Sequence, residues 1–301
     1  MIYIENGSTN PYYNLALEEY FLGGASEDIL LLWQNKNTVV VGRYQNTEQE
    51  TDERFCRAND ISIVRRNTGG GAVYHDLGNL NFSIITDYKQ GDDISFARFS
   101  GAILAALKKL GVDARFQGRN DLVVDGLKIS GGAQAIQHGR ILHHGTLLCC
   151  TDLDMLSGAL RAGRELSERG HILPAQSPPE QSHSEQASQE QSPPEQSHLE
   201  QASQVQSPPE HSHTAHPCSD GSKSKAIASV RSRVANIQDF NNTVTVDLLK
   251  SSLLAEFGGT APLERRELSA AEIADIRLLQ KSKYETWQWN YGESPEISRK
   301  E

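Results

Sequence analysis

The stretch RRNTGGGAVYHDLGNLNFSII, residues 65–85, constrains the fold more than any other part of the chain. Two arginines and a polar pair precede three consecutive glycines, and an alternation of apolar and polar residues typical of a strand follows them. Glycines carry no side chain to keep a ligand away from the backbone. The N–H groups of the triplet could therefore cradle an anion that the adjacent guanidiniums neutralise. A glycine-rich hairpin turn is the alternative and, for an isolated triplet, the commoner case.

Hydrophobic patterns in the rest of the chain predict an α+β fold rather than a doubly wound parallel sheet, because strands outnumber helices and hairpins dominate. Strands are predicted at residues 1–5, 29–33, 38–42, 61–66, 72–75, 79–85, 113–117, 120–124, 128–130 and 141–150. Helices are predicted at residues 11–22, within 43–60, at 92–110 and at 246–257. A last helix is predicted from Ser269, where Glu272 completes a capping box.

The composition indicates a cytoplasmic protein. The chain has 301 residues, 37% of them hydrophobic, which suffices for one large domain or two. Its apolar runs fall short of the roughly 18 residues that cross a membrane, and no secretory signal opens the sequence. Four cysteines in a chain of this length do not form a disulfide framework. A membrane partner is therefore not expected, and a net charge of −10 gives no general case for nucleic acid.

Residues 174–222 differ in composition from the rest of the chain. Three tandem copies of a 15-residue unit that begins QSPPE fill residues 176–220 with Pro, Glu, Gln, Ser and His. So few apolar residues cannot offset the entropy of ordering, and we predict a disordered repeat insert. Its five histidines could bind a metal weakly, but a spacer without chemistry is the favoured interpretation. The folded domain is then divided into residues 1–173 and 223–301.

A second stretch with the composition of a binding site is GRNDLVVDGLKISGGAQ, residues 118–134. Asp121 lies at the start of a predicted strand, and its carboxylate suits Mg²⁺, a hard cation that prefers oxygen ligands. Lys128 lies at the start of the next strand, and its mobile point charge suits a phosphate or a carboxylate that is being activated. For either residue alone, a turn aspartate or an exposed strand lysine is the commoner case.

Two shorter clusters also carry reactive or charged side chains. The adjacent His143 and His144 face opposite sides of a strand, and with Cys149 and Cys150 they do not match zinc spacing. The two cysteines lie in an apolar run, where structural thiols are the common case. In SVRSRV, residues 229–234, two arginines lie two positions apart, so on an extended segment they share a face and could close over an anion. A solvated basic stretch is the alternative.

Five motifs resemble, in this order, those of the lipoate–protein ligase family: RRNTGGGAVYHDLGNLNF, GRNDLVVDGLKISGGAQ, HHGTLL, SVRSRVANI and WQWNYGESP. The resemblance implies a biotin/lipoate ligase-like catalytic domain, similar to that of class II aminoacyl-tRNA synthetases, with a mixed, largely antiparallel sheet and flanking helices. It also implies that lipoate or octanoate reacts with ATP and Mg²⁺ to give an acyl-adenylate. The acyl group would then pass to a specific lysine of an apo lipoyl domain, in the E2 subunits of 2-oxoacid dehydrogenases or in the glycine-cleavage H protein.

The resemblance implies roles for individual residues. Lys128 matches a catalytic lysine that contacts both the lipoate carboxyl group and the phosphate, which agrees with the argument from its charge. Arg65 matches a position that contacts the nucleotide and the lipoyl group of the acyl-adenylate. The other matched positions are Gly70, Gly71, Ala72 and Val73 in the backbone cradle for ATP, Arg231 and Arg233 in the loop over the adenylate, Asn79 and His144 in the lipoate pocket, and Asp121 as a magnesium ligand.

Two features depart from the family. Many members carry an accessory domain of roughly 80–90 residues after the W-x-W motif, whereas this chain ends nine residues after Gly292. The accessory domain is therefore expected to be absent from this chain. Either a separate accessory-domain protein supplies it, or the chain dispenses with it or is truncated. The second departure is the repeat insert, which the fold should tolerate because doubling the length of a surface loop costs only about 0.6 kcal/mol.

Two other classes of protein compete with the ligase. An acyltransferase would take a lipoyl or octanoyl group from a preformed acyl-adenylate or another carrier. Related octanoyl transferases use a cysteine nucleophile, for which Cys149 and Cys150 are the candidates. A lipoyl-domain binding protein without activity would be expected to have lost Lys128 or the glycines, and both are present. ATP-dependent ligation is therefore the favoured prediction.

Overall fold

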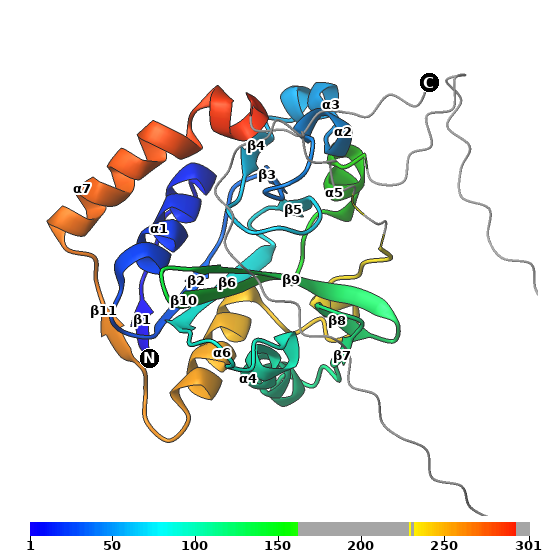
Figure 1. Cartoon of the computed structure of the whole chain (residues 1–301). Helices are drawn as coiled ribbons and strands as arrows, with labels where there is room; N and C mark the ends of the chain where they lie inside the picture. Colours follow the sequence, from blue (N-terminus) through cyan, green and yellow to red (C-terminus); the bar gives the residue numbers. More distant parts are fainter. Residues whose placement is uncertain (162–228, 230–231, 293–301) are drawn as a thin grey trace, which may run out of the picture. The chain divides into compact units, whose positions relative to one another are not determined.

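The larger of two β-sheets organises the part of the chain that the structure describes (Figure 1). This computed structural model describes residues 1–161, 229 and 232–292, so the predicted repeat insert and Arg231 lie outside the described residues. The strands of the larger sheet follow the order β11-β1-β2-β6-β10-β9-β8-β7. Their bounds are β1 (Ile2–Ile4), β2 (Ile29–Trp33), β6 (Asn79–Asp87), β7 (Arg115–Gln117), β8 (Asp121–Val124), β9 (Leu127–Gln137), β10 (Arg140–Leu148) and β11 (Glu264–Arg266).

The strand pairing in this sheet is mixed and largely antiparallel, which confirms the predicted α+β fold. β6 pairs antiparallel with β2 and β10, and the series continues antiparallel through β9, β8 and β7. Parallel pairing occurs at the other edge, where β1 lies between β2 and β11. Hairpins therefore build one half of the sheet, as the dominance of hairpins in the sequence pattern indicated.

Helices α1 and α7 begin where the sequence predicts them. α1 (Pro11–Gly24) starts after Asn10, whose side chain accepts two N–H groups of the first turn. α7 (Ala270–Leu279) starts at the predicted capping box of Ser269. The other helical segments are α2 (Thr47–Glu50), α3 (Glu53–Ala58), α4 (Phe96–Lys109), α5 (Leu153–Ala159), α6 (Val246–Gly258), the 3₁₀ turn η1 (Ile237–Asp239) and the π-helical turns η2 (Gln280–Tyr284) and η3 (Gln288–Gly292).

Helix α4 begins four residues later than the predicted start at residue 92, because the two aspartates there form local turns instead. Lys89 N–H donates to Asp92 Oδ2 at 2.8 Å, and Ser95 N–H donates to Asp93 Oδ1 at 2.8 Å. Ser95 then caps the helix. Short acidic side chains often favour such turns over the helix interior. None of the described helices is long and apolar enough to cross a bilayer.

Strand β6 separates two environments, because successive residues of a strand face opposite sides of the sheet. One side packs against α4 and α6, as the alternation in the sequence predicted; its residues are Leu80, Phe82 and Ile84. The opposite side carries the polar residues Asn79, Asn81 and Ser83. A polar row thus lies on the face of the sheet away from α4 and α6.

A smaller sheet, in the order β4-β3-β5, carries the glycine loop between two of its strands. β3 (Thr38–Val41) pairs parallel with β4 (Ser62–Arg65) and antiparallel with β5 (Val73–His75). β2 and β3 are both confirmed, but they belong to different sheets, so residues 34–37 carry the chain from one sheet to the other. One side of the small sheet shares a core with α1, and the other packs on α3 and α5.

Candidate active site

The polar row of β6 continues across the neighbouring strands. Asn81 pairs with Trp33 on β2 and with Thr146 on β10, and Ser83 pairs with His144 on β10. Directly paired residues of neighbouring strands lie on the same face of a sheet. The floor of the candidate site is therefore a polar strip that runs from β2 through β6 to β10.

Lys128 and Asp121 extend this strip to strands β9 and β8. Lys128 Nζ lies 2.8 Å from Asp121 Oδ1, and the two side chains are 25% and 30% exposed. Gly131 makes room for the lysine, since a Cβ atom there would lie 2.9 Å from Nζ. The N–H group of Gly131 donates to Thr146 Oγ1 at 3.3 Å. The structure thus brings the predicted catalytic lysine and the predicted magnesium ligand together, next to the polar strip.

The SVRSRV segment lies beside Lys128, although it is about 100 residues away in sequence. Lys128 N–H donates to Arg233 O at 2.9 Å, and Ala235 N–H donates to Lys128 O at 3.0 Å. Ser229, the first residue of the motif, donates its N–H to Glu50 Oε1 at 3.1 Å. Arg233 is exposed. The end of the predicted loop therefore lies along the start of β9, whereas Ser229 lies against α2.

Arg66 shapes the glycine loop. Its Nη2 donates to the carbonyl oxygens of Gly69 at 2.6 Å and Gly71 at 2.8 Å. In a planar trans peptide the N–H group points away from the C=O group, so the N–H groups of Gly70 and Ala72 face away from this guanidinium. Ala72 N–H donates to Ser229 Oγ at 2.9 Å. The loop therefore turns backbone donors toward the side where the SVRSRV segment begins.

Gly42 supports the loop from behind, a role that the sequence analysis missed. A Cβ atom at Gly42 would lie 2.0 Å from the carbonyl oxygen of Gly70, so this close approach requires glycine. Gly70 itself has φ +92°, in the region that favours glycine. Gln45 links Gly42 to Ser229, because its Oε1 accepts from Gly42 N–H and its Nε2 donates to Ser229 Oγ, both at 2.9 Å. A glycine directly after an apolar strand was the available signal.

Arg65 points away from the glycine loop, and the direct nucleotide contact that the resemblance implied stays a prediction. Its side chain is fully buried. The guanidinium donates, over 2.7–3.2 Å, to the carbonyl oxygens of Gly42, Arg43, Gln45, Trp289 and Asn290 and to Thr47 Oγ1. Adjacent strand residues point in opposite directions, so with Arg66 on the loop side, Arg65 lies against the turn η3. Its position is a supporting one.

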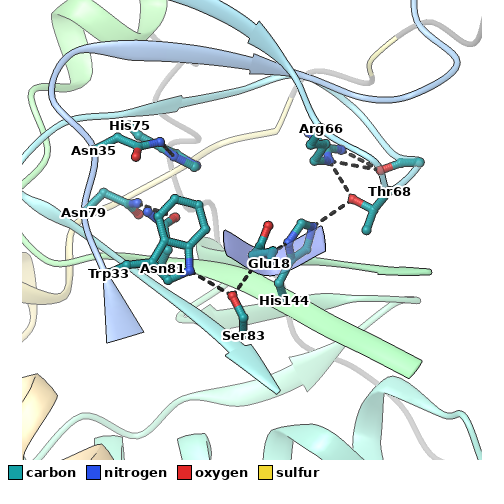
Figure 2. Close-up of polar contacts among 11 residues, drawn as sticks. Glu18, Trp33, Asn35, Arg66, Thr68, His75, Asn79, Asn81, Ser83 and His144 are labelled. Atoms are coloured by element: carbon teal, nitrogen blue, oxygen red, sulfur yellow. Dashed lines mark hydrogen bonds and ion pairs between the residues drawn. The ribbon is translucent and has the colours of Figure 1, made fainter. Parts of the chain in front are cut away.

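His144 lies between the sheet and the glycine loop and has a partner at each ring nitrogen (Figure 2). Nδ1 lies 2.8 Å from Glu18 Oε1, and Nε2 lies 2.8 Å from Thr68 Oγ1. Glu18 also accepts from the Ser83 hydroxyl at 2.5 Å, and Arg66 Nε donates to Thr68 Oγ1 at 2.9 Å. The predicted lipoate contact of His144 could then use its ring face but not a free ring nitrogen.

Asn79 is fully buried and keeps an oxygen available for a ligand. Its Nδ2 donates to Asn81 Oδ1 at 2.9 Å. Within residues 1–161, 229 and 232–292, Asn79 Oδ1, Asn81 Nδ2 and His75 Nε2 are buried atoms without a hydrogen-bond partner. Burial, and then the charge of Arg66, lowers the pKa of His75 to about 3, so the ring is neutral. Since buried polar groups normally have partners, these atoms can bind a polar group or an ordered water molecule.

The carboxylates of the site fit a magnesium ion only if phosphate oxygens complete its coordination. Among the described residues, no group of three His, Cys, Asp or Glu side chains could hold a metal. Magnesium in nucleotide sites commonly takes one or two carboxylates together with phosphate oxygens and water. Asp121, which lies next to Lys128 and is partly exposed, fits that part.

The cysteine candidates do not suit a covalent transferase mechanism. Cys149 is buried, and burial first, then the neighbouring Cys150, raises the pKa of its thiol to about 12. A thiol that stays protonated at neutral pH is a poor nucleophile. Cys150 is exposed and lies after the end of β10, outside the polar strip.

Glu18 is a second residue that the sequence analysis missed. It lies on α1 and is only 3% exposed, among the buried apolar residues of that helix. A carboxylate on the buried face of an amphipathic helix was the available signal, because buried charges need partners. Thr68 and Ser229 lie within motifs that the sequence analysis singled out, but it gave neither residue a partner, since His144 and Ala72 lie 76 and 157 residues away from them in sequence.

Comparisons with known proteins show which family the chain resembles. The model of the lipoyl protein ligase A/B catalytic domain matches residues 10–177. Lipoate–protein ligase 1 of Staphylococcus aureus is 35% identical over 296 residues, which cover 97% of this chain and 74% of the relative. A bi-partite lipoate protein ligase of Thermoplasma acidophilum, from a study of an archaeal lipoylation system and its E2 lipoyl domain, superposes with a TM-score of 0.70 at 26% identity and covers 99% of this chain and 98% of its own.

A further solved structure, a lipoate–protein ligase A bound with ATP, superposes with a TM-score of 0.68 at 26% identity, covering 97% of this chain and 98% of its own. The family model matches more than half of the chain, and the Staphylococcus relative matches nearly all of it. The chain therefore belongs to the family of lipoyl protein ligase A/B catalytic domains.

Proposed function

We infer that this chain is an ATP-dependent lipoate–protein ligase, and we propose that the polar strip and the glycine loop form its adenylation site. The family match, the lipoate–protein ligase relatives and the similar ligase bound with ATP support the activity. The observation that carries the site is the position of Lys128. Its ammonium group lies next to the polar strip, beside Asp121 and along the SVRSRV segment.

The proposed reaction has two steps. A carboxylate oxygen of lipoate or octanoate attacks the α-phosphorus of ATP, the bond from that phosphorus to the bridging oxygen breaks, and pyrophosphate leaves. The amine of an acceptor lysine then attacks the acyl carbonyl. An amide forms, AMP leaves, and the amine proton is released. The first step brings two anions together, so the site must hold them in position and screen their repulsion.

Lys128 supplies that screening in the proposal. A lysine ammonium is a compact charge on a flexible stem, and it can contact the lipoate carboxylate and the α-phosphate together. Its partner Asp121 keeps it beside Gly131, where no side chain blocks approach. Charge development on the phosphoryl oxygens would strengthen the contact in the transition state, which is how a fixed charge accelerates a reaction.

The backbone of Gly70, Gly71, Ala72 and Val73 would cradle the phosphates. The direction of the loop peptides supports this, because Arg66 holds two carbonyl groups and leaves the following N–H groups facing away from it. Ser229 already accepts from one of these donors. Arg233 and Arg231 would close over the adenylate from the same segment, with Arg65 acting from below through the strand that leads into the loop.

Lipoate would lie along the polar strip, with Asn79 and His144 in its pocket. The unpartnered oxygen of Asn79 supports a polar contact there. Magnesium would be held by Asp121 together with phosphate oxygens, and when bound it would neutralise phosphate charge. The chain itself would orient Asp121 through Lys128, so the two residues would share the task of placing the nucleotide.

The acceptors are lipoyl domains, and we propose that they include the E2 subunits of 2-oxoacid dehydrogenases and the glycine-cleavage H protein. Residues 1–173 and 223–301 would form the catalytic domain on either side of the repeat insert. A separate accessory-domain protein is a proposed partner; the bi-partite ligase of Thermoplasma acidophilum supports that arrangement for a related chain. The unpaired thiols of Cys56, Cys149 and Cys150 support a cytoplasmic, reducing location.

One assay tests the proposed function. The purified chain is incubated with an apo lipoyl domain, lipoate and Mg-ATP, and the mass of the acceptor is followed. We expect acceptor modification that requires ATP, and pyrophosphate release that requires lipoate but not the acceptor. Modification that occurs only from an added acyl-adenylate, whether or not ATP is present, would assign the chain to the transferases and contradict the proposal.

A further inference from the structure

We propose that a buried chain of hydrogen bonds positions the glycine loop for nucleotide binding, and that Glu18 is its central positioning residue. The chain crosses from the large sheet to the loop through side chains of five separate segments (Figure 2). In order, its members are Trp33, Ser83, Glu18, His144, Thr68 and Arg66. The proposal rests on the proposed function, because it concerns how the loop of that site is held.

This chain of hydrogen bonds is continuous, and the side chains that form it are buried. Trp33 Nε1 donates to Ser83 Oγ at 2.8 Å, and the Ser83 hydroxyl donates to Glu18 Oε1 at 2.5 Å. His144 bridges from Glu18 to Thr68 with both contacts at 2.8 Å. All of these side chains, and that of Arg66, are buried, with exposures of 0–8%. Buried hydrogen bonds of this kind fix geometry, because a buried donor or acceptor that loses its partner cannot bond to water instead.

Glu18 determines which nitrogen of His144 carries the proton. An ionised carboxylate can only accept, so the His144 Nδ1–H group donates to Glu18 Oε1. In the tautomer that we propose, Nε2 is the acceptor, and the Thr68 hydroxyl donates to it. Thr68 Oγ1 in turn accepts from Arg66 Nε at 2.9 Å. From each end of the hydrogen-bond chain, every donor thus points toward Glu18, which accepts from both sides.

Charge gives a second reason for the carboxylate. Arg66 is almost fully buried, and desolvation lowers the pKa of its guanidinium to about 10, an effect that the charge of Glu18 opposes. The two opposite charges are joined through His144 and Thr68 rather than by direct contact. A carboxylate three hydrogen bonds away therefore helps to keep the buried guanidinium charged, as its contacts with carbonyl oxygens require.

The geometry of the cradle depends on the orientation of Arg66. Nη2 of this residue holds the carbonyl groups of Gly69 and Gly71, and its Nη1 donates to Val40 O at 3.1 Å. Nε also donates to Gly69 O at the longer distance of 3.2 Å. Without Thr68 this contact alone would hold Nε, and the guanidinium could rotate and release the loop carbonyls. The amides of Gly70 and Ala72 would then lose the direction in which they meet a phosphate. Weaker nucleotide binding is the expected result, with the chemistry of bound substrate less affected.

Three variants and one matched control test the proposal. Thr68→Val removes the hydroxyl and keeps the shape, Thr68→Ser restores it, and Glu18→Gln removes the charge. Thr38→Val is the control, since Thr38 is also a buried threonine on a neighbouring strand and donates locally to Lys36 O. Pyrophosphate release is measured at varied ATP with saturating lipoate, and thermal unfolding is measured on the same samples.

We expect Thr68→Val to raise KM for ATP about tenfold, the size of one lost buried hydrogen bond, with a smaller change in kcat. Thr68→Ser should return KM to within about twofold of the wild type. Glu18→Gln should raise KM for ATP as well. The double variant with Thr68→Val should have a KM no higher than that of the single variant with the higher KM, because both substitutions break the same chain of hydrogen bonds. A wild-type KM in Thr68→Val, or effects that multiply in the double variant, would overturn the proposal.

The tautomer of His144 gives a readout that does not depend on activity or on the folding of a variant. Nitrogen-15 NMR of the wild-type chain, assigned with a His144→Gln variant, should show a protonated Nδ1 and an unprotonated Nε2. A protonated Nε2 would overturn the proposal even if KM moved as expected. Failure of the wild type to release pyrophosphate with lipoate and ATP would instead refute the proposed function, so the two failures are distinguishable.

Discussion

Replacement of Lys128 by alanine is the perturbation that separates chemistry from stability in this site. Removing a preorganised charge from the place where negative charge develops costs about 10²–10³-fold in rate. The fold should change little. Although Lys128 Nζ lies 2.8 Å from Asp121 Oδ1, the two side chains are 25% and 30% exposed, so water screens the pair. Pairs with such access to water contribute about 1 kcal/mol or less, which corresponds to roughly 2–4 °C in Tm for a chain of this size.

The assay is pyrophosphate release from ATP with saturating lipoate, and Tm is measured on the same samples. Lys109→Ala is the matched control, since Lys109 also pairs with a carboxylate, that of Glu256, but joins α4 to α6 on the opposite side of the large sheet. Lys128→Arg keeps the charge on a larger planar group and should retain part of the rate. Pyrophosphate release by Lys128→Ala at the wild-type rate would refute the role that we assign to this lysine.

Three further changes probe the loop, the thiols and the metal. Gly42→Ala places a methyl carbon 2.0 Å from Gly70 O, so it should lower the free energy of unfolding by about 1–3 kcal/mol and weaken ATP binding; an unchanged denaturation midpoint would contradict the close approach. Cys150→Ala should transfer the acyl group within about twofold of the wild-type rate, and an acyl adduct of the enzyme in mass spectra would argue otherwise. A chelator should stop pyrophosphate release until Mg²⁺ is added back, while Tm stays constant because the described residues hold no metal cluster of their own.

Local chemistry made much of this fold predictable from the sequence. The alternation along residues 79–85 predicted both the strand and its two faces, because a period of two needs no knowledge of distant residues. The capping box at Ser269 predicted the start of α7 for the same reason. Lys128 and the glycine triplet were also recognisable, since their chemistry is carried by a few neighbouring residues.

Long-range partners were beyond the reach of the sequence. The assignment of β2 and β3 to different sheets depends on pairing with strands far along the chain. Glu18 meets His144 across 126 positions, and no pattern within α1 specifies which histidine, if any, it will contact. The sequence therefore indicated a candidate reactive residue and a candidate backbone cradle, whose roles stay predictions, but not the side chains that hold these parts in place.

The pair Arg65 and Arg66 shows how one step along a strand divides two tasks. Both are buried, and both looked equally suited to an anion in the sequence. Because consecutive side chains of an extended strand point in opposite directions, only one of them can lie on the side of the glycine loop. Arg66 holds the loop carbonyls, whereas Arg65 bonds to the carbonyl groups of η3, and Trp289 Nε1 returns a hydrogen bond to Arg65 O at 2.8 Å.

Residues far from the glycine loop in sequence, Trp289 and Asn290, hold the strand end from which the loop extends. The peptide of Arg65 is fixed on both sides, since its N–H group donates to Asn290 Oδ1 at 2.8 Å. A rigid strand end fixes the point from which Arg66 and the glycines extend, so the cradle can keep its direction before any nucleotide binds. Preorganisation of this kind lowers the cost of binding and of charge development. We therefore expect the residues around Trp289 to support the proposed adenylation site, although none of them lies on the polar strip.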